Sequence, residues 1–472
     1  MSEGRARRVV CIVMLAVSLG FVPITLAEDA AKSPPPAAAP VAEKPAVTPA
    51  TAAAAAAPPE KPRERDLTAL LFGDKADGFI DKTKAPVPWF KWGADLRFRE
   101  EYIGAAGLNR HLPRTSQGRE VSWQRYRPRW WSTITPAKDV DLNLRITWEG
   151  RHYTEPEGMP DFDQGECMVD NLNLKLTNVG GSPLSMTLGR QDIRLGDGWL
   201  VGDGTGADGS RTYFFDAARF TYEFKSICTT ADVIYIDQDA LGDRWIENFH
   251  DLDRAFIEQD ERGFILWVAN TSIKDTEIDG YYIYKDMTRV FPNGDIGFIH
   301  AFGARVAGSL SEHWQYRAEG AHEFGSHNDR PLQAWGFNSR LTYLCKDEVS
   351  SQFRGTYEFL SGEDPATHTT EAWVSLWGRW PQWSELLGYV WPRMGEGRSF
   401  ELSNLHRIGP GWSCCPTDKL ELTADYYLLF CDENAFRHTL TRRRTPRATS
   451  ARAARFAARW STSGRNRRSP NT

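Results

Sequence analysis

Long apolar runs are scarce in this chain. Beyond Pro88 there is no run of 18 or more apolar residues, and a membrane-spanning helix needs about 20 of them. Helical transport proteins are therefore excluded for this part of the sequence. The mean hydropathy of −0.49 would suit a soluble protein. It also suits a transmembrane β-barrel, because barrel strands carry apolar residues only at alternate positions.

Enzyme signatures are also missing. The sequence has no G-x-S-x-G motif, no phosphate-binding loop, and no metal-ligand spacing among its seven cysteines. The histidines His152, His250, His300 and His322 have no convincing nucleophile partner, and the last two fall in the apolar register of their segments. We therefore expect no catalytic residues, no cofactor, no metal site and no nucleic-acid partner.

The N-terminus has the pattern of a secretory signal peptide. Arg5, Arg7 and Arg8 form a basic region, Val9–Leu19 is apolar, and Thr25–Ala27 offers small residues for cleavage. The apolar stretch is too short for a spanning helix, although an N-terminal membrane anchor is the alternative. The sequence therefore predicts export from the cytoplasm.

Composition divides the chain into five parts. Residues 1–27 are the expected signal peptide, and residues 28–65, mostly Ala, Pro, Lys and Glu, are expected to form a mobile periplasmic linker. Residues 66–87 form a short segment of unknown role, and residues 88–437 form the main domain. Residues 438–472 carry ten Arg but no Asp, Glu or Lys.

The main domain has a period-two pattern of apolar and polar residues. In Asp139–Arg151, Leu142 and Leu144 share one face, and Asn143 and Arg145 share the other. Such alternation in segments of about ten residues is typical of transmembrane β-strands. Fifteen segments are predicted as strands: Lys91–Tyr102, Ser122–Ile134, Asp139–Arg151, Asn171–Thr177, Leu184–Leu195, Thr212–Phe224, Thr229–Asp237, Gly263–Ala269, Gly280–Lys285, Gly297–Leu310, Trp314–Phe324, Leu332–Cys345, Ser350–Leu360, Phe400–Trp412 and Lys419–Phe430.

Short and long connections alternate between these strands. The short turns are Pro136–Asp139, Val179–Ser182, Lys346–Glu348 and Pro416–Asp418. The long loops are Ile103–Val121, His152–Val169, Gly196–Arg211 and Asp239–Arg262. Short periplasmic turns and long external loops are the asymmetry of outer-membrane barrels. The 18 Trp, 15 Tyr and 24 Phe suit aromatic girdles at the two membrane interfaces, or sugar-stacking surfaces.

These patterns predict an all-β fold, a transmembrane antiparallel up-and-down β-barrel of about 16–18 strands in the outer membrane. A fifteenth strand ending near Cys431 would finish outside, so a returning strand is required to close the barrel. Residues 438–472 show no alternation and cannot supply it. We interpret them as a frameshifted reading of the closing strands or a disordered segment, and a genuine basic tail is the alternative.

Arginines fall repeatedly on the polar faces of the predicted strands, for example Arg125, Arg127 and Arg129 at a spacing of two. At the membrane midplane an arginine facing lipid would cost about 2–4 kcal/mol, so these side chains are expected to point inward. One interpretation is a lumen of mutually compensating ion pairs. The other is a constriction that selects anions, since guanidinium groups bind carboxylates in a bidentate manner.

Three segments resemble the alginate-export family of outer-membrane barrels. They are Leu188–Arg219, with Gly189-Arg190-Gln191 before a Gly/Asp-rich loop, the strand Arg125–Arg129, and Leu376–Leu386. The resemblance extends from about Trp89 to Arg437. It implies a barrel with an electropositive lumen that passes an anionic exopolysaccharide. It also implies that Leu376–Leu386 is a loop folding over the opening, for which a girdle fragment is the alternative.

The sequence therefore favours a channel for an anionic, alginate-like polysaccharide or for small anionic solutes, surrounded by outer-membrane lipid. A general or substrate-specific uptake porin is the alternative, and a barrel enzyme or a secreted sugar-binding β protein represents other classes. The candidate pore-lining residues, of which Arg190, Gln191, Asp192 and Arg194 rest on the resemblance, are Arg97, Arg99, Arg125, Arg127, Arg129, Arg145, Arg190, Gln191, Asp192, Arg194, Arg219, Arg305, Arg317, Arg340 and Arg354.

Overall fold

The computed structural model describes residues 12–21, 82–103, 121–155, 163–203, 213–247, 249, 256–364, 366–378, 402–417 and 420–433. Most of these residues belong to antiparallel β-strands. Among them, no helix has the length and apolar character needed to cross a membrane. The expected linker and tail, and most of the segment before residue 88, lie outside the described residues.

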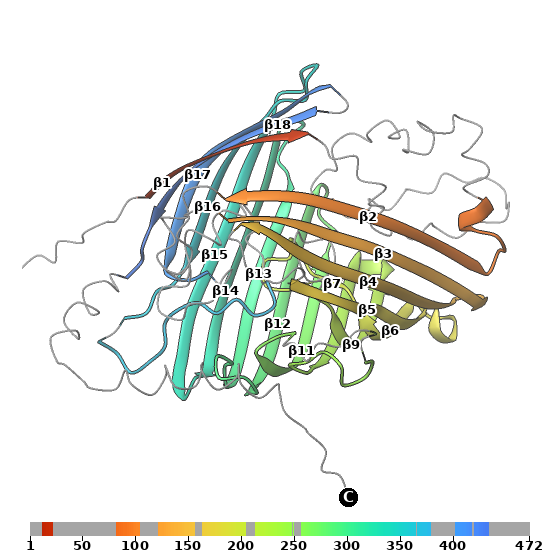
Figure 1. Cartoon of the computed structure of the whole chain (residues 1–472). Helices are drawn as coiled ribbons and strands as arrows, with labels where there is room; N and C mark the ends of the chain where they lie inside the picture. Colours follow the sequence, from red (N-terminus) through yellow and green to blue (C-terminus); the bar gives the residue numbers. More distant parts are fainter. Residues whose placement is uncertain are drawn as a thin grey trace, which may run out of the picture. The chain divides into compact units, whose positions relative to one another are not determined.

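Among the described residues, one sheet contains sixteen strands, in which the strands from β2 to β18 follow one another in chain order and β1 pairs with β18 (Figure 1). β6 pairs directly with β9, because β7 (Ile193–Arg194) and β8 (Gly202–Asp203) form a separate hairpin. The strands of the large sheet are β1 (Ile12–Phe21), β2 (Phe90–Ile103), β3 (Val121–Ala137), β4 (Val140–Glu155), β5 (Asp163–Leu176), β6 (Leu184–Gln191), β9 (Phe215–Phe224), β10 (Thr229–Gln238), β11 (Gln259–Asn270), β12 (Thr276–Arg289), β13 (Gly297–Ser309), β14 (Trp314–His327), β15 (Arg330–Leu344), β16 (Gln352–Leu360), β17 (Leu405–Thr417) and β18 (Leu420–Phe430).

The fifteen predicted strands correspond one to one to β2–β6 and β9–β18. The largest difference in bounds is at β5, which begins at Asp163 and not near Asn171. The pairing of β4 with β5 is interrupted by two register shifts, near Arg145 and Glu149. Such bulges break the period-two pattern, and for this reason the sequence places the first half of β5 in the loop His152–Val169.

β1 consists mostly of apolar residues, and the sequence assigns them to the signal peptide. It pairs antiparallel with β18, from Ile12 opposite Leu429 to Phe21 opposite Leu420. β1 thus occupies the edge of β18 where the sequence requires a returning strand. β1 and β2 are the edge strands of the described sheet, and no pairing among the described residues joins them. Cleavage after Ala27 remains our proposal for this segment.

Connections of different length lie at opposite ends of the strands. The turns after β3, β5, β9, β11, β13, β15 and β17 are short and share one end of the sheet, as expected for an up-and-down arrangement. The connections at the other end include the long ones after β2, β6, β10 and β16. The connections after β4 and β12, at the same end, are shorter, and the shortest there is the two-residue turn Asn328-Asp329 between β14 and β15, where both residues have positive φ. Asn and Asp tolerate this conformation, which suits a tight hairpin.

The two faces of the sheet differ in composition. The outer face carries exposed apolar side chains such as Leu96, Phe98 and Leu341, which are 56%, 55% and 44% exposed. The inner face carries the arginines Arg125, Arg127 and Arg129, all less than a tenth exposed. Residues paired across neighbouring strands share a face, so the printed register extends this division around the sheet.

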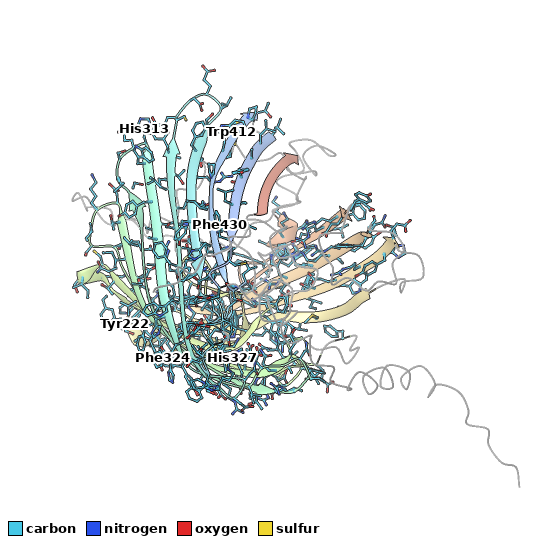
Figure 2. All side chains as sticks on the ribbon, turned by 90° about the vertical axis from the view of Figure 1, so that its left-hand side faces the viewer. Tyr222, His313, Phe324, His327, Trp412 and Phe430 are labelled. Carbon is cyan, nitrogen blue, oxygen red and sulfur yellow. The ribbon has the colours of Figure 1, made fainter. Side chains whose placement is uncertain are left out.

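Aromatic side chains on the outer face gather near both ends of the strands. At the short-turn end, Trp314 packs on Tyr343 with ring centroids 4.9 Å apart. At the other end, Phe324 stacks on His300 at 5.1 Å, and Figure 2 shows Phe324 at the opposite end from His313. Trp314 and Phe324 are ten positions apart on β14. At about 3.4 Å for each position and a typical strand tilt, they are separated by about 25 Å across the membrane, which is the height of a barrel's apolar band.

The inner face is not polar throughout. Ile234, Ile265, Ile283 and Ile299 are fully buried there and form a core with side chains of the β6–β9 and β16–β17 connections. The expectation that the apolar side chains of the strands face lipid is therefore wrong for this part of the wall. The physical reason is that these connections cover the inner face and remove it from water.

Candidate functional site

Arginines of β2 and β3 form the first group on the inner face. Arg97 lies directly opposite Arg127, and Arg99 lies opposite Arg125. Acids accompany them, since Arg125 Nη1 is 2.5 Å from Glu101 Oε1 and Arg129 Nε is 3.0 Å from Asp95 Oδ2. Like charges at directly opposed positions destabilise a sheet. Sheet stability alone therefore does not explain why arginines occupy these opposed positions of β2 and β3.

Arg145 and Arg219 are held by ion pairs along the wall. Arg145 contacts Asp170 and Asp192, each at 2.7 Å. Arg219 contacts Asp232 with nitrogen–oxygen distances of 2.8 and 3.1 Å. These contacts match the interpretation of compensating ion pairs that stiffen the wall.

Arg190 lies elsewhere than the resemblance implies. It is 1% exposed and opposite Leu172, an exposed residue of the outer face. Its guanidinium donates to both oxygens of Asp216, at 2.9 and 3.0 Å, and to the backbone oxygens of Val169 and Gly242. We correct the expectation that Arg190 projects near the pore, because loop residues cover it and its donors are bound to protein.

The neighbouring residues of that motif have two different environments. The Gln191 side chain donates to three backbone oxygens, those of Thr187, Gly189 and Ala217, and is buried. Asp192 and Arg194 are exposed, and Arg194 donates to the backbone oxygen of Asp197 at 2.9 Å. Gln191 therefore has a structural environment, whereas Asp192 and Arg194 remain accessible.

The second arginine group lies on β13–β16 of the inner face. Arg317 and Arg340 are directly opposite each other on β14 and β15. Arg305 on β13 contacts Glu277 at 2.6 Å and Asp279 at 2.8 Å. Arg354 on β16 contacts Asp425 at 2.8 Å. Four of the predicted arginines thus come from four consecutive strands.

Arg407 on β17 belongs to the same region and was not predicted. It is fully buried, and its guanidinium lies 2.9 Å from Glu358 Oε2. The sequence that follows it alternates, with Ile408, Pro410 and Trp412 on one face and Arg407, Gly409 and Gly411 on the other. A strict reading of the register on β17 would therefore have found it.

Two connections cover the inner face. We call residues 192–203, which include β7 and β8, the inner hairpin, and residues 373–378 the inner segment. They pair with each other in parallel, through a bridge between Val201 and Trp377. Trp377 N donates to Leu200 O at 2.9 Å, and Trp199 stacks on Trp373 with centroids 5.1 Å apart. The inner hairpin and the inner segment therefore form one unit.

Charged groups of the wall bind the inner segment. Trp377 Nε1 donates to Glu261 Oε2 at 2.8 Å, and Lys285 Nζ donates to Leu376 O at 2.6 Å. Val374 N donates to Glu323 Oε2 at 3.0 Å. Because these groups are buried, each such hydrogen bond is stronger than it would be in water. The inner segment is therefore fixed to β11, β12 and β14.

Glycines of the wall make room for the tryptophan rings. A Cβ at Gly263 would lie 2.3 Å from Trp377 Cη2, and one at Gly336 would lie 2.7 Å from Trp373 Cη2. Glycine within a strand often marks a close approach of another part of the chain. This signal was present in the sequence and could have predicted that something packs against the inner face.

The expected loop Leu376–Leu386 is described only up to residue 378. The described part lies against the inner face, not in the outer aromatic belts, because Leu376 and Trp377 are at most 1% exposed. The remainder, residues 379–386, lies outside the described residues. Among the described residues, no group of three His, Cys, Asp or Glu is placed to hold a metal ion.

The family model described as "Alginate export" matches residues 89–437, most of the chain. The chain belongs to the alginate export family. This membership confirms the family predicted from the sequence and, with the antiparallel sheet, the prediction of an outer-membrane β-barrel protein of the porin type. Members of the family are channel-type proteins, so the coarse class of transport is confirmed too.

Solved structures similar to the chain include three outer-membrane porins. Pseudomonas putida OprB has 8% sequence identity and a TM-score of 0.38, over 76% of this chain and 96% of OprB. Pseudomonas aeruginosa OpdL has 12% identity and a TM-score of 0.37, over 73% and 98%. A mutant Rh. blastica porin has 9% identity and a TM-score of 0.34, over 72% and 99%. No curated protein matches the chain.

Proposed function

We propose that this member of the alginate export family passes anionic solutes across the outer membrane along the arginine-bearing inner face. The solute is an anionic polysaccharide of the uronate type or a smaller carboxylated molecule. The observation that supports this most is the direct opposition of Arg317 and Arg340 beside the inner hairpin. Two guanidinium groups facing one another across a ladder repel, and an anion that binds both removes the repulsion.

Ion pairing along the wall is compatible with this role. Arg219 and Arg354 have acids at 2.8 Å and hold the strands in register. The opposed pairs Arg97 with Arg127 and Arg99 with Arg125 resemble the Arg317–Arg340 pair in arrangement. We propose that the opposed pairs guide anions, with Arg125 and Arg317 also in contact with acids, and that Arg219 and Arg354 stabilise the wall. No catalytic role is proposed for the described histidines, since His300 and His322 lie in the outer aromatic belt.

The expected behaviour in a planar lipid bilayer follows from this charge arrangement. In a gradient of potassium chloride, the reversal potential should have the sign of a chloride-preferring channel. A trimer of galacturonate should block the current, and its methyl ester, which lacks the negative charges, should not. A cation-preferring reversal potential, or equal block by the acid and the ester, would contradict the proposal.

A general uptake porin is the second candidate. It is favoured by the acids near the arginines, which leave little net charge on parts of the wall. The two candidates differ in the galacturonate experiment, because a general porin shows no block that depends on the charge of the sugar.

A further inference from the structure

Asp197 lies at the turn of the inner hairpin, between β7 and β8, and reaches the arginines of the wall. Gly196 and Gly198 flank it, both with positive φ. A Cβ at Gly196 would lie 3.0 Å from Arg305 Cδ and 3.2 Å from a ring carbon of Trp267. The two glycines allow the chain to turn closely enough for the carboxylate to enter the arginine group.

One carboxylate bridges two guanidinium groups there. Asp197 Oδ1 is 2.9 Å from Arg317 Nη1, and Asp197 Oδ2 is 3.2 Å from Arg305 Nε. Burial alone would raise the pKa of Asp197, but Arg317 and Arg305 outweigh it and hold the pKa below its usual value. The side chain is therefore an anion at neutral pH, bound as a solute carboxylate would be.

Asp197 is not needed to compensate Arg305. That side chain keeps Glu277 at 2.6 Å and Asp279 at 2.8 Å, both from β12. The contact of Asp197 is also of a different kind, since it comes from a connection and not from a neighbouring strand. An acid on a hairpin that contacts both Arg317 and an arginine already paired with two acids of the wall, Arg305, has the arrangement of a tethered ligand.

We propose that Asp197 is a tethered carboxylate that occupies, at Arg305 and Arg317, the place where the carboxylate of a passing solute binds. Solute and Asp197 then compete for the same two guanidinium groups, and binding of the solute releases the turn of the inner hairpin. The class of ligand is a carboxylated sugar, and this inference rests on the proposed function. Asp197 thus acts as a gate, which opens when a solute carboxylate displaces it from the two guanidinium groups.

Asp197→Asn tests this competition, because the amide keeps the size of the side chain and removes its charge. The concentration of trigalacturonate that blocks half the current should fall in the variant. A gate that is closed in nine of ten molecules weakens apparent binding on the order of tenfold, so a decrease of that order is expected. The methyl ester should block neither protein.

The matched control is Glu312→Gln, which removes one carboxylate from a short turn, where Glu312 is 84% exposed. Its half-blocking concentration should equal that of the unchanged protein. Heat-modified mobility in detergent shows whether each variant folds. If Asp197→Asn fails to fold, Asp197→Ser, which removes the charge in a smaller side chain, takes its place in the same titration.

The outcomes separate the two proposals. Charge-dependent block of the unchanged protein with an equal or higher half-blocking concentration in Asp197→Asn overturns the gate and leaves the proposed function standing. Absence of charge-dependent block in both proteins overturns the proposed function, and the gate with it. A decrease in the variant, without one in Glu312→Gln, supports both.

Discussion

Replacement of Arg317 and Arg340 together by glutamate is expected to convert the channel from anion preference to cation preference. The two side chains are directly opposed on β14 and β15, on the face that carries the inner hairpin. Their change from positive to negative adds two carboxylates where two guanidinium groups were, next to Glu319 and Asp197. The measurement is the reversal potential in a potassium chloride gradient, whose sign should invert.

The control for this charge reversal is Lys346→Glu. Lys346 lies on a short turn, 46% exposed, and contacts Glu312 at 2.7 Å. This substitution changes the net charge of the protein by the same amount as each of the two arginine substitutions, but it lies away from the inner face. Its reversal potential should remain that of the unchanged protein. The double variant Arg317→Gln with Arg340→Gln should give an intermediate value, and an unchanged value in both double variants would contradict a role for this pair in selectivity.

Removal of the Trp377 side chain is expected to raise the single-channel conductance. Trp377 is 1% exposed, fills the space above Gly263 and donates to Glu261. Trp377→Ala leaves a cavity, and such a change in a packed core costs about 3–5 kcal/mol. The inner segment would then lose its attachment to β11, while Glu261 keeps Lys285 at 2.9 Å. A less firmly held inner segment obstructs less of the inner face.

Trp335→Ala is the matched control for this change. Trp335 is 57% exposed on the outer face, where it stacks on His322. The same truncation there should leave conductance unchanged. Equal conductance of Trp377→Ala and the unchanged protein, with both folded, would show that the inner segment does not limit the current.

The strands were predictable because alternation is a local signal. Leu142 and Asn143 differ in polarity within a single segment, and the structure places such neighbours on opposite faces. The boundary of β5 was not predictable in the same way, since two register shifts disturb its alternation. The short turns were predictable from their residues, and Asn328-Asp329 shows that a connection at the long-loop end can be short as well.

The candidate site was predictable in part. The arginines on β2, β3 and β13–β16 follow from the polar register, and the structure places them on one face. The environment of Arg190 was not predictable, because Asp216 and Gly242 reach it from distant parts of the chain. The same holds for the inner segment, whose attachment to Glu261 and Lys285 joins residues more than ninety positions apart. Contacts of this kind leave no periodic trace in a sequence.

β1 shows another limit of local patterns. The predicted apolar part of the signal peptide is Val9–Leu19, and in the structure most of these residues belong to β1, the strand beside β18. An apolar stretch of this length can serve as a signal peptide or as a strand, because signal recognition and strand formation both depend on apolar side chains. The pairing does show that the free edge of β18 accepts an apolar strand, in the place where closure of a barrel requires a returning strand.

We infer that the outer face contacts hydrocarbon and that the inner face lines a path for water and ions. Arg340 and Leu341 are adjacent on β15 and point to opposite faces, and Leu341 is 44% exposed. In a background whose cysteines are replaced by serine, the variants Arg340→Cys and Leu341→Cys are treated with a membrane-impermeant sulfonated thiol reagent during current recording. We expect the reagent to change the current of Arg340→Cys only, while Leu341→Cys reacts only with a lipid-soluble maleimide. Reaction of Leu341→Cys with the impermeant reagent, together with protection of Arg340→Cys, would contradict it.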